Sequence, residues 1–122
     1  MKTVKLKNII FVNGFTQALN KLMKEPISPL NGFRLAKFAK KVSENEKFFL
    51  EQKEKMIKKY GVENKEKAGE YTFTKENQEK LDKDWKELLD IEEEYKLDPI
   101  ELKDETNLNT LDLMMLMDIL KT

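Results

Sequence analysis

Residues 28–61 read SPLNGFRLAKFAKKVSENEKFFLEQKEKMIKKYG, and the rest of the chain is organised around them. Ser28 can accept a hydrogen bond from a free backbone N–H at the start of a helix, and Pro29 suits the first helical position. Leu35, Val42 and Phe49 recur every seven residues, which predicts one apolar stripe along a helix from Ser28 to Tyr60. The same stripe includes Phe38, Ala39, Met56, Ile57 and Tyr60. At 1.5 Å per residue, this helix would be roughly 45 Å long.

Several residues of this helix carry more specific predictions. We expect Gly61 to end the helix in the left-handed conformation, and Lys58 and Lys59 to interact favourably with the negative end of the helix dipole. Asn45 and Gln52 interrupt the apolar stripe. Two interpretations of them stay open: they face water at the rim of the stripe, or they set the register of a coiled-coil-like contact.

The residues before the long helix predict a strand and a second helix. Val4 and Leu6 alternate with lysines, as in a short strand with one covered face. From Ile10 onward the spacing becomes helical, and the helix should end before Pro26. Its apolar face consists of Phe11, Phe15, Ala18, Leu19 and Leu22. Gly14 weakens this helix, and the short connector predicts that it packs antiparallel to the long helix as a helical hairpin.

After the long helix, the sequence predicts a loop, a strand, a helix and another strand. Residues 62–70 are polar and read as a loop, and residues 71–74 are suited to a short strand. Thr74 should cap a helix whose apolar face is Leu81, Trp85, Leu88 and Leu89. Alternation over residues 91–97 predicts an outer strand, because Pro99 cannot donate to a ladder. These elements could form a right-handed crossover unit, with residues 4–6 as a further strand.

The last predicted helix is the candidate partner-binding element. Asn107 or Asn109 can cap it, and residues 111–120 are apolar except for Asp112 and Asp118. A helix that is apolar nearly all round must be covered, either by this domain or by another chain. Methionine is common at adaptable binding surfaces. Both alternatives stay open, and the candidate partner-binding residues are Leu113, Met114, Met115 and Met117.

Together these elements predict an α+β fold that is mainly α. We expect a single domain over residues 1–122, built on an antiparallel helical hairpin with a long central helix, a small sheet of short strands and two further helices. The chain is 39% hydrophobic and 38% charged, which is too apolar and too periodic for a disordered protein.

Composition also limits the chemistry. The chain contains no cysteine and no histidine, which excludes thiol nucleophiles, disulfides, Cys/His zinc sites and imidazole acid–base catalysis. No glycine-rich phosphate loop or nucleophile elbow is present. We therefore expect a protein that is not an enzyme and that has no cofactor and no metal. Since no segment resembles a signal peptide or a membrane span, we expect a soluble, cytoplasmic protein with no membrane partner.

The net charge of zero conceals two oppositely charged halves. Residues 1–60 carry thirteen lysines, one arginine and five acids, a net charge of +9, whereas residues 61–122 carry nine lysines and eighteen acids, a net charge of −9. The halves either fold against each other or present a basic and an acidic face to different partners. A basic stripe could follow a phosphate backbone, and it consists of Arg34, Lys37, Lys40 and Lys41.

Two other features suggest chemistry but have simpler interpretations. Glu92, Glu93 and Glu94 could bind a hard cation or act as paired acids. In an alternating strand Glu93 points away from the other two, so we interpret all three as a solvated sheet edge. Trp85 could stack on a ligand, but its place on an apolar helical face favours packing in the core.

The order of these elements resembles a family of small uncharacterised proteins encoded by phages and prophages of Gram-positive bacteria. The resemblance rests on LKN at 6–8, IKKYG at 57–61, WKELLDI at 85–91 and the alternating residues from Tyr95 to Leu102 before a leucine-rich final helix. It spans most of the chain but carries no catalytic residues. It implies a phage context, in the cytoplasm of an infected or lysogenic host or associated with the virion.

We therefore expect a non-enzymatic phage protein that occupies the surface of a protein partner. The partner would be a host factor, such as a defence complex that the protein inhibits, or a phage assembly partner, and self-association is also expected. One alternative is a nucleic-acid or phosphate-ligand binding protein that uses the basic N-terminal half. Another is a small structural or oligomeric protein of the virion or of the lysis module. A small carboxylate-based enzyme is the least favoured interpretation.

Overall fold

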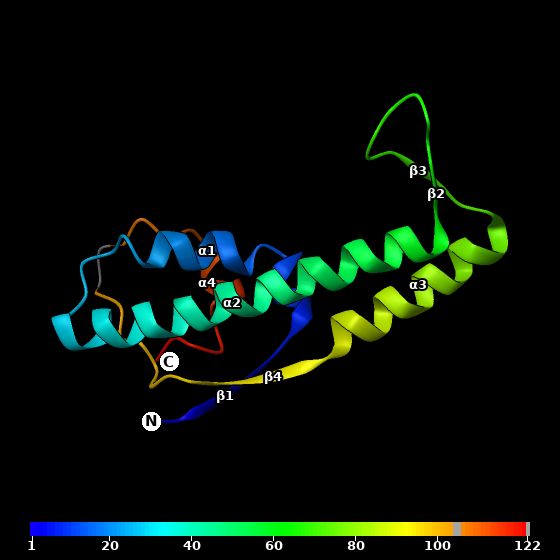
Figure 1. Ribbon diagram of the computed structural model, residues 1–122. Helices are drawn as coiled ribbons and strands as arrows, with labels where there is room; N and C mark the ends of the chain where they lie inside the picture. Colours follow the sequence, from blue (N-terminus) through cyan, green and yellow to red (C-terminus); the bar gives the residue numbers. More distant parts are fainter. Residues whose placement is uncertain (104–105, 122) are drawn as a thin grey trace.

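The computed structural model describes residues 1–103 and 106–121, and it has the predicted mainly α, α+β fold (Figure 1). Four α-helices, one 3-10 helix and four short strands make up the described part of the chain. In chain order these are β1 (Thr3–Lys7), η1 (Asn8–Phe11), α1 (Phe15–Leu22), α2 (Pro29–Tyr60), β2 (Val62–Glu63), β3 (Tyr71–Thr72), α3 (Lys75–Asp90), β4 (Glu92–Lys96) and α4 (Thr110–Met115).

The long helix α2 begins and is buried as its sequence predicts. The Ser28 hydroxyl accepts a hydrogen bond from the Asn31 backbone N–H at 3.2 Å, and Pro29 is the first helical residue. The helix spans 32 residues and buries Leu35, Phe38, Val42 and Phe49. Figure 1 shows α3 running antiparallel along the second half of α2, while α1 lies along the first half.

The prediction for Gly61 is wrong in its conformation. Gly61 is extended, with φ −98° and ψ 158°, a region that any residue can adopt. A Cβ atom at this position would lie 2.8 Å from the Ile57 carbonyl oxygen and 2.9 Å from the Phe73 ring. Glycine is therefore required here for space, because the segment after α2 passes directly over the end of the helix.

The helix that was expected to begin near Ile10 and to end before Pro26 is divided into two parts. Gly14 has φ 102°, in the left-handed region, and it separates η1 from α1. The Asn13 side chain then accepts a hydrogen bond from the Phe15 N–H at 3.0 Å. This break turns the two phenylalanines of the predicted face to different parts of α2. Phe11 packs on Phe49 with ring centroids 5.2 Å apart, and Phe15 packs on Phe38 at 6.4 Å.

The strands pair differently from the predicted crossover unit. β1 pairs with β4 in an antiparallel sheet, with Val4 opposite Tyr95 and Leu6 opposite Glu93. β3 pairs with β2 in a separate hairpin that projects beyond the end of α2 (Figure 1), so residues 62–63 are strand rather than loop. The crossover fails because β3 and β4 lie at opposite ends of the 16-residue helix α3 and hydrogen-bond with different partners.

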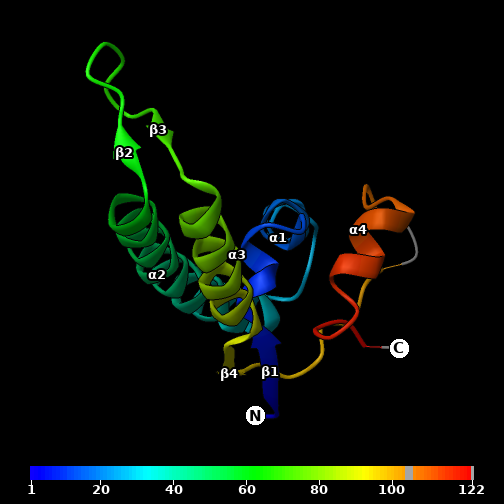
Figure 2. The ribbon, with the colours of Figure 1, turned by 90° about the vertical axis from the view of Figure 1, so that its right-hand side faces the viewer.

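The core lies where α1, the first half of α2, the β1–β4 sheet and the C-terminal segment meet. Figure 2 shows α1 between the α2–α3 pair and α4. Leu22, Ile100, Leu116 and Ile119 are fully buried at this junction. Among the described residues, no helix is both long enough and apolar enough to cross a membrane.

Candidate protein-binding surface

The helix that carries the predicted partner-binding residues is shorter than the sequence indicated. α4 ends at Met115 instead of continuing to Leu120. The chain then turns so that the Ile100 N–H donates to the Ile119 carbonyl at 2.8 Å, and the Lys121 N–H donates to the Ile100 carbonyl at 2.8 Å. If the helix continued to Leu120, the Lys121 N–H would donate to the Met117 carbonyl instead, so the bond from Lys121 to Ile100 would be lost.

Of the two predicted alternatives, core packing holds for one side of this segment, and the other side is exposed. Leu116 and Ile119 are fully buried, whereas Leu111, Met114 and Met117 are 68%, 55% and 62% exposed. Leu113 is exposed at the border, and Met115 is half-buried against the core. We call the exposed residues, Leu111, Leu113, Met114 and Met117, the α4 surface. Met115 is thus the one predicted binding residue that faces mainly inward.

A groove between α4 and η1 adjoins this surface. Ile9 and Ile10 contribute its apolar lining from η1, and Met114 and Met115 contribute from α4. Ile9 is 45% exposed, and it lies before the helix that was predicted to begin at Ile10. The groove also contains charged side chains of both signs, which are Lys5, Lys7, Glu92 and Asp118.

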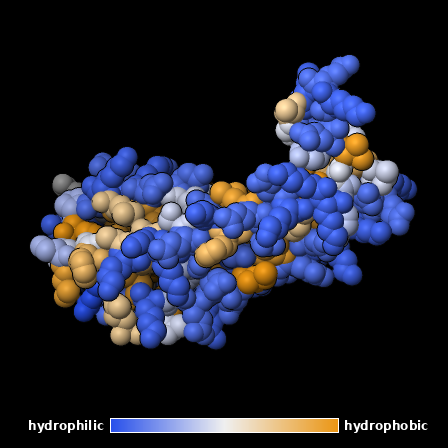
Figure 3. All heavy atoms as spheres, viewed as in Figure 1, coloured by the Kyte–Doolittle hydropathy of each residue, from blue (hydrophilic) through white to orange (hydrophobic). Residues whose placement is uncertain are grey.

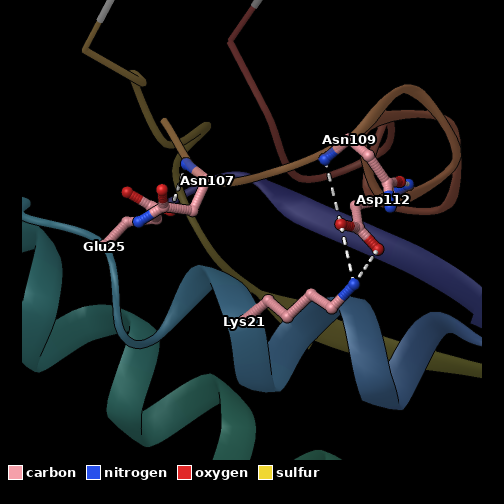
Figure 4. A network of polar contacts seen from close by, with 5 residues as sticks. All are labelled: Lys21, Glu25, Asn107, Asn109 and Asp112. Atoms are coloured by element: carbon pink, nitrogen blue, oxygen red, sulfur yellow. Dashed lines mark hydrogen bonds and ion pairs between the residues drawn. The ribbon is translucent and has the colours of Figure 1, made fainter. Parts of the chain in front are cut away.

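A polar network holds α4 against α1 (Figure 4). Asp112 and Asn109 form a capping box, in which each side chain accepts the backbone N–H of the other residue at 3.0 and 2.9 Å. The Lys21 ammonium from α1 donates to both Asp112 oxygens at 3.2 and 3.1 Å. The hydrogen bond from Asn109 is the main reason that the pKa of Asp112 lies below its usual value, and Lys21 lowers it further.

A second contact holds the segment that leads into α4. The buried Glu25 carboxylate accepts a hydrogen bond from the Asn107 backbone N–H at 2.7 Å (Figure 4). Of the two predicted caps, Asn109 is the one used, while Asn107 contacts Glu25 in the turn after α1. Because α4 is fixed from both sides, its exposed side chains are displayed from a rigid support.

Two of the four residues of the predicted basic stripe contact the acidic half of the chain. Arg34 pairs with Asp98 at 3.3 Å, and the Lys41 ammonium donates to the Glu94 carbonyl at 2.7 Å. Lys41 also lies 5.3 Å from the centre of the Tyr95 ring. Lys37 lies 5.6 Å from the ring centre of the exposed Phe33, and Lys40 is exposed. The two oppositely charged halves therefore meet along the first part of α2.

The glutamates and the tryptophan have positions that fit their simpler interpretations. Glu92 and Glu94 are exposed on one side of β4, and Glu93 points to the other side with Tyr95. Trp85 is half-buried and packs on Phe49, with ring centroids 5.4 Å apart. Within residues 1–103 and 106–121, no group of three or more acidic side chains is arranged to hold a metal ion.

Comparison of the chain with protein-family models, with curated proteins and with solved structures found no match. The resemblance to phage-encoded proteins therefore stays a prediction.

Proposed function

We propose that this protein is a non-enzymatic binding protein whose α4 surface docks on an apolar segment of a partner protein. The observation that supports this proposal is the exposure of Leu111, Met114 and Met117 on a segment whose opposite side is completely buried. Soluble proteins rarely leave contiguous apolar side chains uncovered unless the surface has a binding role.

The neighbouring groove adds to the argument. It gives a partner side chain an apolar lining of Ile9 and Met114 next to the exposed row, so the partner would be held by a cavity as well as by a flat surface. Methionine side chains adapt their shape to what they contact. The groove also contains two lysines and two acids, which can pair with polar or oppositely charged side chains at the rim of the partner.

If the protein is encoded by a phage, as its resemblance to phage proteins implies, this partner would be a host factor, such as a defence complex, or a phage assembly protein. The nucleic-acid alternative has less support, because Arg34 and Lys41 already have partners within the chain. Phosphate binding by these two side chains would require those contacts to break.

Lysine substitutions on the α4 surface test the proposal. Met114→Lys and Met117→Lys place a charge at exposed positions, so both variants should keep the wild-type circular dichroism spectrum but lose the partner. The assay is capture from nuclease-treated host lysate, followed by titration of the captured protein, once purified, against wild type and each variant. We expect at least a tenfold weaker dissociation constant for each variant.

Leu50→Lys is the matched control. Leu50 is 52% exposed on α2, away from the α4 surface, and the new lysine would lie four residues from Glu46 and from Glu54. This variant should bind as the wild type does. A partner that binds wild type, Met117→Lys and Leu50→Lys equally would contradict the proposed surface. Failure of the wild type to capture any protein would contradict the proposed function itself.

A further inference from the structure

The α2 helix carries a second row of side chains beside its buried stripe. The row is spaced by three or four residues, so its members share one face of the helix, and they are Asn45, Phe48, Gln52, Lys55 and Lys59. This row lines an open groove between α2 and α3, which we call the α2–α3 groove.

The two walls of the α2–α3 groove carry opposite charges. Lys55 and Lys59 line it from α2, while Asp84 and Glu87 line it from α3. Among the described residues, neither lysine lies within 4.0 Å of either carboxylate. Asp84 instead accepts a 2.6 Å hydrogen bond from the Tyr60 hydroxyl. The groove therefore presents one basic and one acidic wall to whatever enters it.

Apolar side chains lie between these walls. Phe48 is 63% exposed and Ile91 is 47% exposed, and both line the end of the groove nearest β4 together with Leu88. On the face that Figure 3 shows, the part of the molecule formed by α3 and the second half of α2 is mainly hydrophilic, with a few hydrophobic residues between the hydrophilic ones. Covering such an exposed phenylalanine with another surface is favourable in free energy, because it removes the apolar ring from water.

We propose that a second copy of this chain occupies the α2–α3 groove. A twofold axis that runs parallel to the helices places α2 of each copy over α3 of the other. Lys55 then faces the partner's Glu87, and by symmetry Glu87 faces the partner's Lys55. Phe48 enters the partner's apolar pocket beside Ile91, because Phe48 and Ile91 lie at the same height along the groove. Each favourable contact thus occurs twice.

The charges favour a second copy over other occupants. Nucleic acid would meet the carboxylates of Asp84 and Glu87, which repel phosphate. A second copy has no net charge, so no long-range repulsion opposes its approach.

The 16 residues of α3 give a shared face about 24 Å long and about 20 Å wide, roughly 500 Å² in projection. This is less than the roughly 800 Å² per partner of a standard stable interface, so the dimer should be weak and should dissociate on dilution.

Charge exchange between two variants tests this proposal. Lys55→Glu places like charges against the partner's Glu87, and Glu87→Lys places like charges against the partner's Lys55, so each variant alone should be monomeric. Mixed in equal amounts, the two variants should form a heterodimer, because both of its contacts join opposite charges. One contact is the original pair of Lys55 and Glu87, and at the other contact the two charges are exchanged. Sedimentation equilibrium over a wide concentration range, at low and moderate salt, gives the molecular mass of each variant alone and of the mixture.

Two further variants separate this surface from the α4 surface. Phe48→Lys should weaken the wild-type dimer at least tenfold, while Leu50→Lys and Met117→Lys should leave it unchanged. A wild type that stays monomeric at millimolar concentration would overturn the proposal, as would a mixture of Lys55→Glu and Glu87→Lys that remains monomeric. If Met117→Lys abolishes the dimer and Phe48→Lys does not, the copies meet through the α4 surface and the α2–α3 groove is not the interface.

Discussion

The Asn45 side-chain amide donates a 2.9 Å hydrogen bond to the hydroxyl of Tyr95. Tyr95 is only 1% exposed, and its ring packs edge-on against Phe38 with centroids 5.4 Å apart. Burial raises the pKa of Tyr95, and the bond from Asn45 partly opposes this effect. Asn45 therefore joins α2 to β4 through a hydrogen bond, a role that differs from both of its predicted roles. Gln52 is exposed in the α2–α3 groove.

Removing either partner of this hydrogen bond should weaken the fold. We expect Asn45→Ala and Tyr95→Phe each to lower the free energy of unfolding by about 1 kcal/mol. The double variant should lose less than the sum, because the two changes remove the same bond. Urea unfolding of the four proteins measures the difference, and additive losses would show that the bond contributes nothing.

Phe48 and Phe49 form a matched pair of adjacent phenylalanines. Phe49 is buried between Phe11 and Trp85, so Phe49→Ala should lower the free energy of unfolding by about 3 to 5 kcal/mol. Phe48 is exposed, and Phe48→Ala should change it by less than about 1 kcal/mol at concentrations where the protein is monomeric. Chemical denaturation of both variants checks the difference. Equal losses would mean that the stripe is not the buried side of α2.

Gly61 and Gly32 should respond to alanine in opposite directions. A methyl group at Gly61 meets the backbone oxygen of Ile57, which cannot move without disturbing the helix end, so Gly61→Ala should cost about 1 to 3 kcal/mol. Gly32 lies inside α2, where the nearest atoms are in Ile27 at 3.8 Å. Gly32→Ala should therefore stabilise the protein by about 0.5 to 1 kcal/mol. Thermal unfolding gives both signs, and a stabilising Gly61→Ala would refute the steric explanation.

Asp112 should make the stability of the protein depend on acidic pH. Its pKa is lower in the folded than in the unfolded protein, so its contribution is complete above the unfolded pKa of about 4 and is lost as pH falls through the folded pKa. Asp112→Asn should therefore be less stable than wild type at neutral pH, and the difference should shrink below about pH 4. Asp118→Asn, a change to an exposed carboxylate in the same segment, is the control. A difference that is constant from pH 7 to pH 2 would contradict the role given to the charge of Asp112.

The elements that are stabilised by nearby residues could be predicted from sequence patterns. Ser28 and Thr74 cap their helices through bonds to residues three positions away, and the seven-residue spacing of Leu35, Val42 and Phe49 requires one buried face on α2. Alternation likewise located β1 and β4. The nearly all-apolar composition of residues 111–120 also identified the methionine-rich segment as a candidate interface, because such a segment must be covered by this domain or by another chain.

The choice of which surfaces meet depends on long-range packing and could not be predicted from sequence patterns. β1 pairs with β4 from the other end of the chain, and no local pattern records that choice of partner. α4 stops at Met115, and the backbone that follows it forms two hydrogen bonds with Ile100. In this arrangement Met114 and Met117 are exposed, whereas Met115 is half-buried against the core. The walls of the α2–α3 groove likewise come from two helices. Such features depend on long-range packing, whereas caps and periodicities depend on neighbours within a few residues.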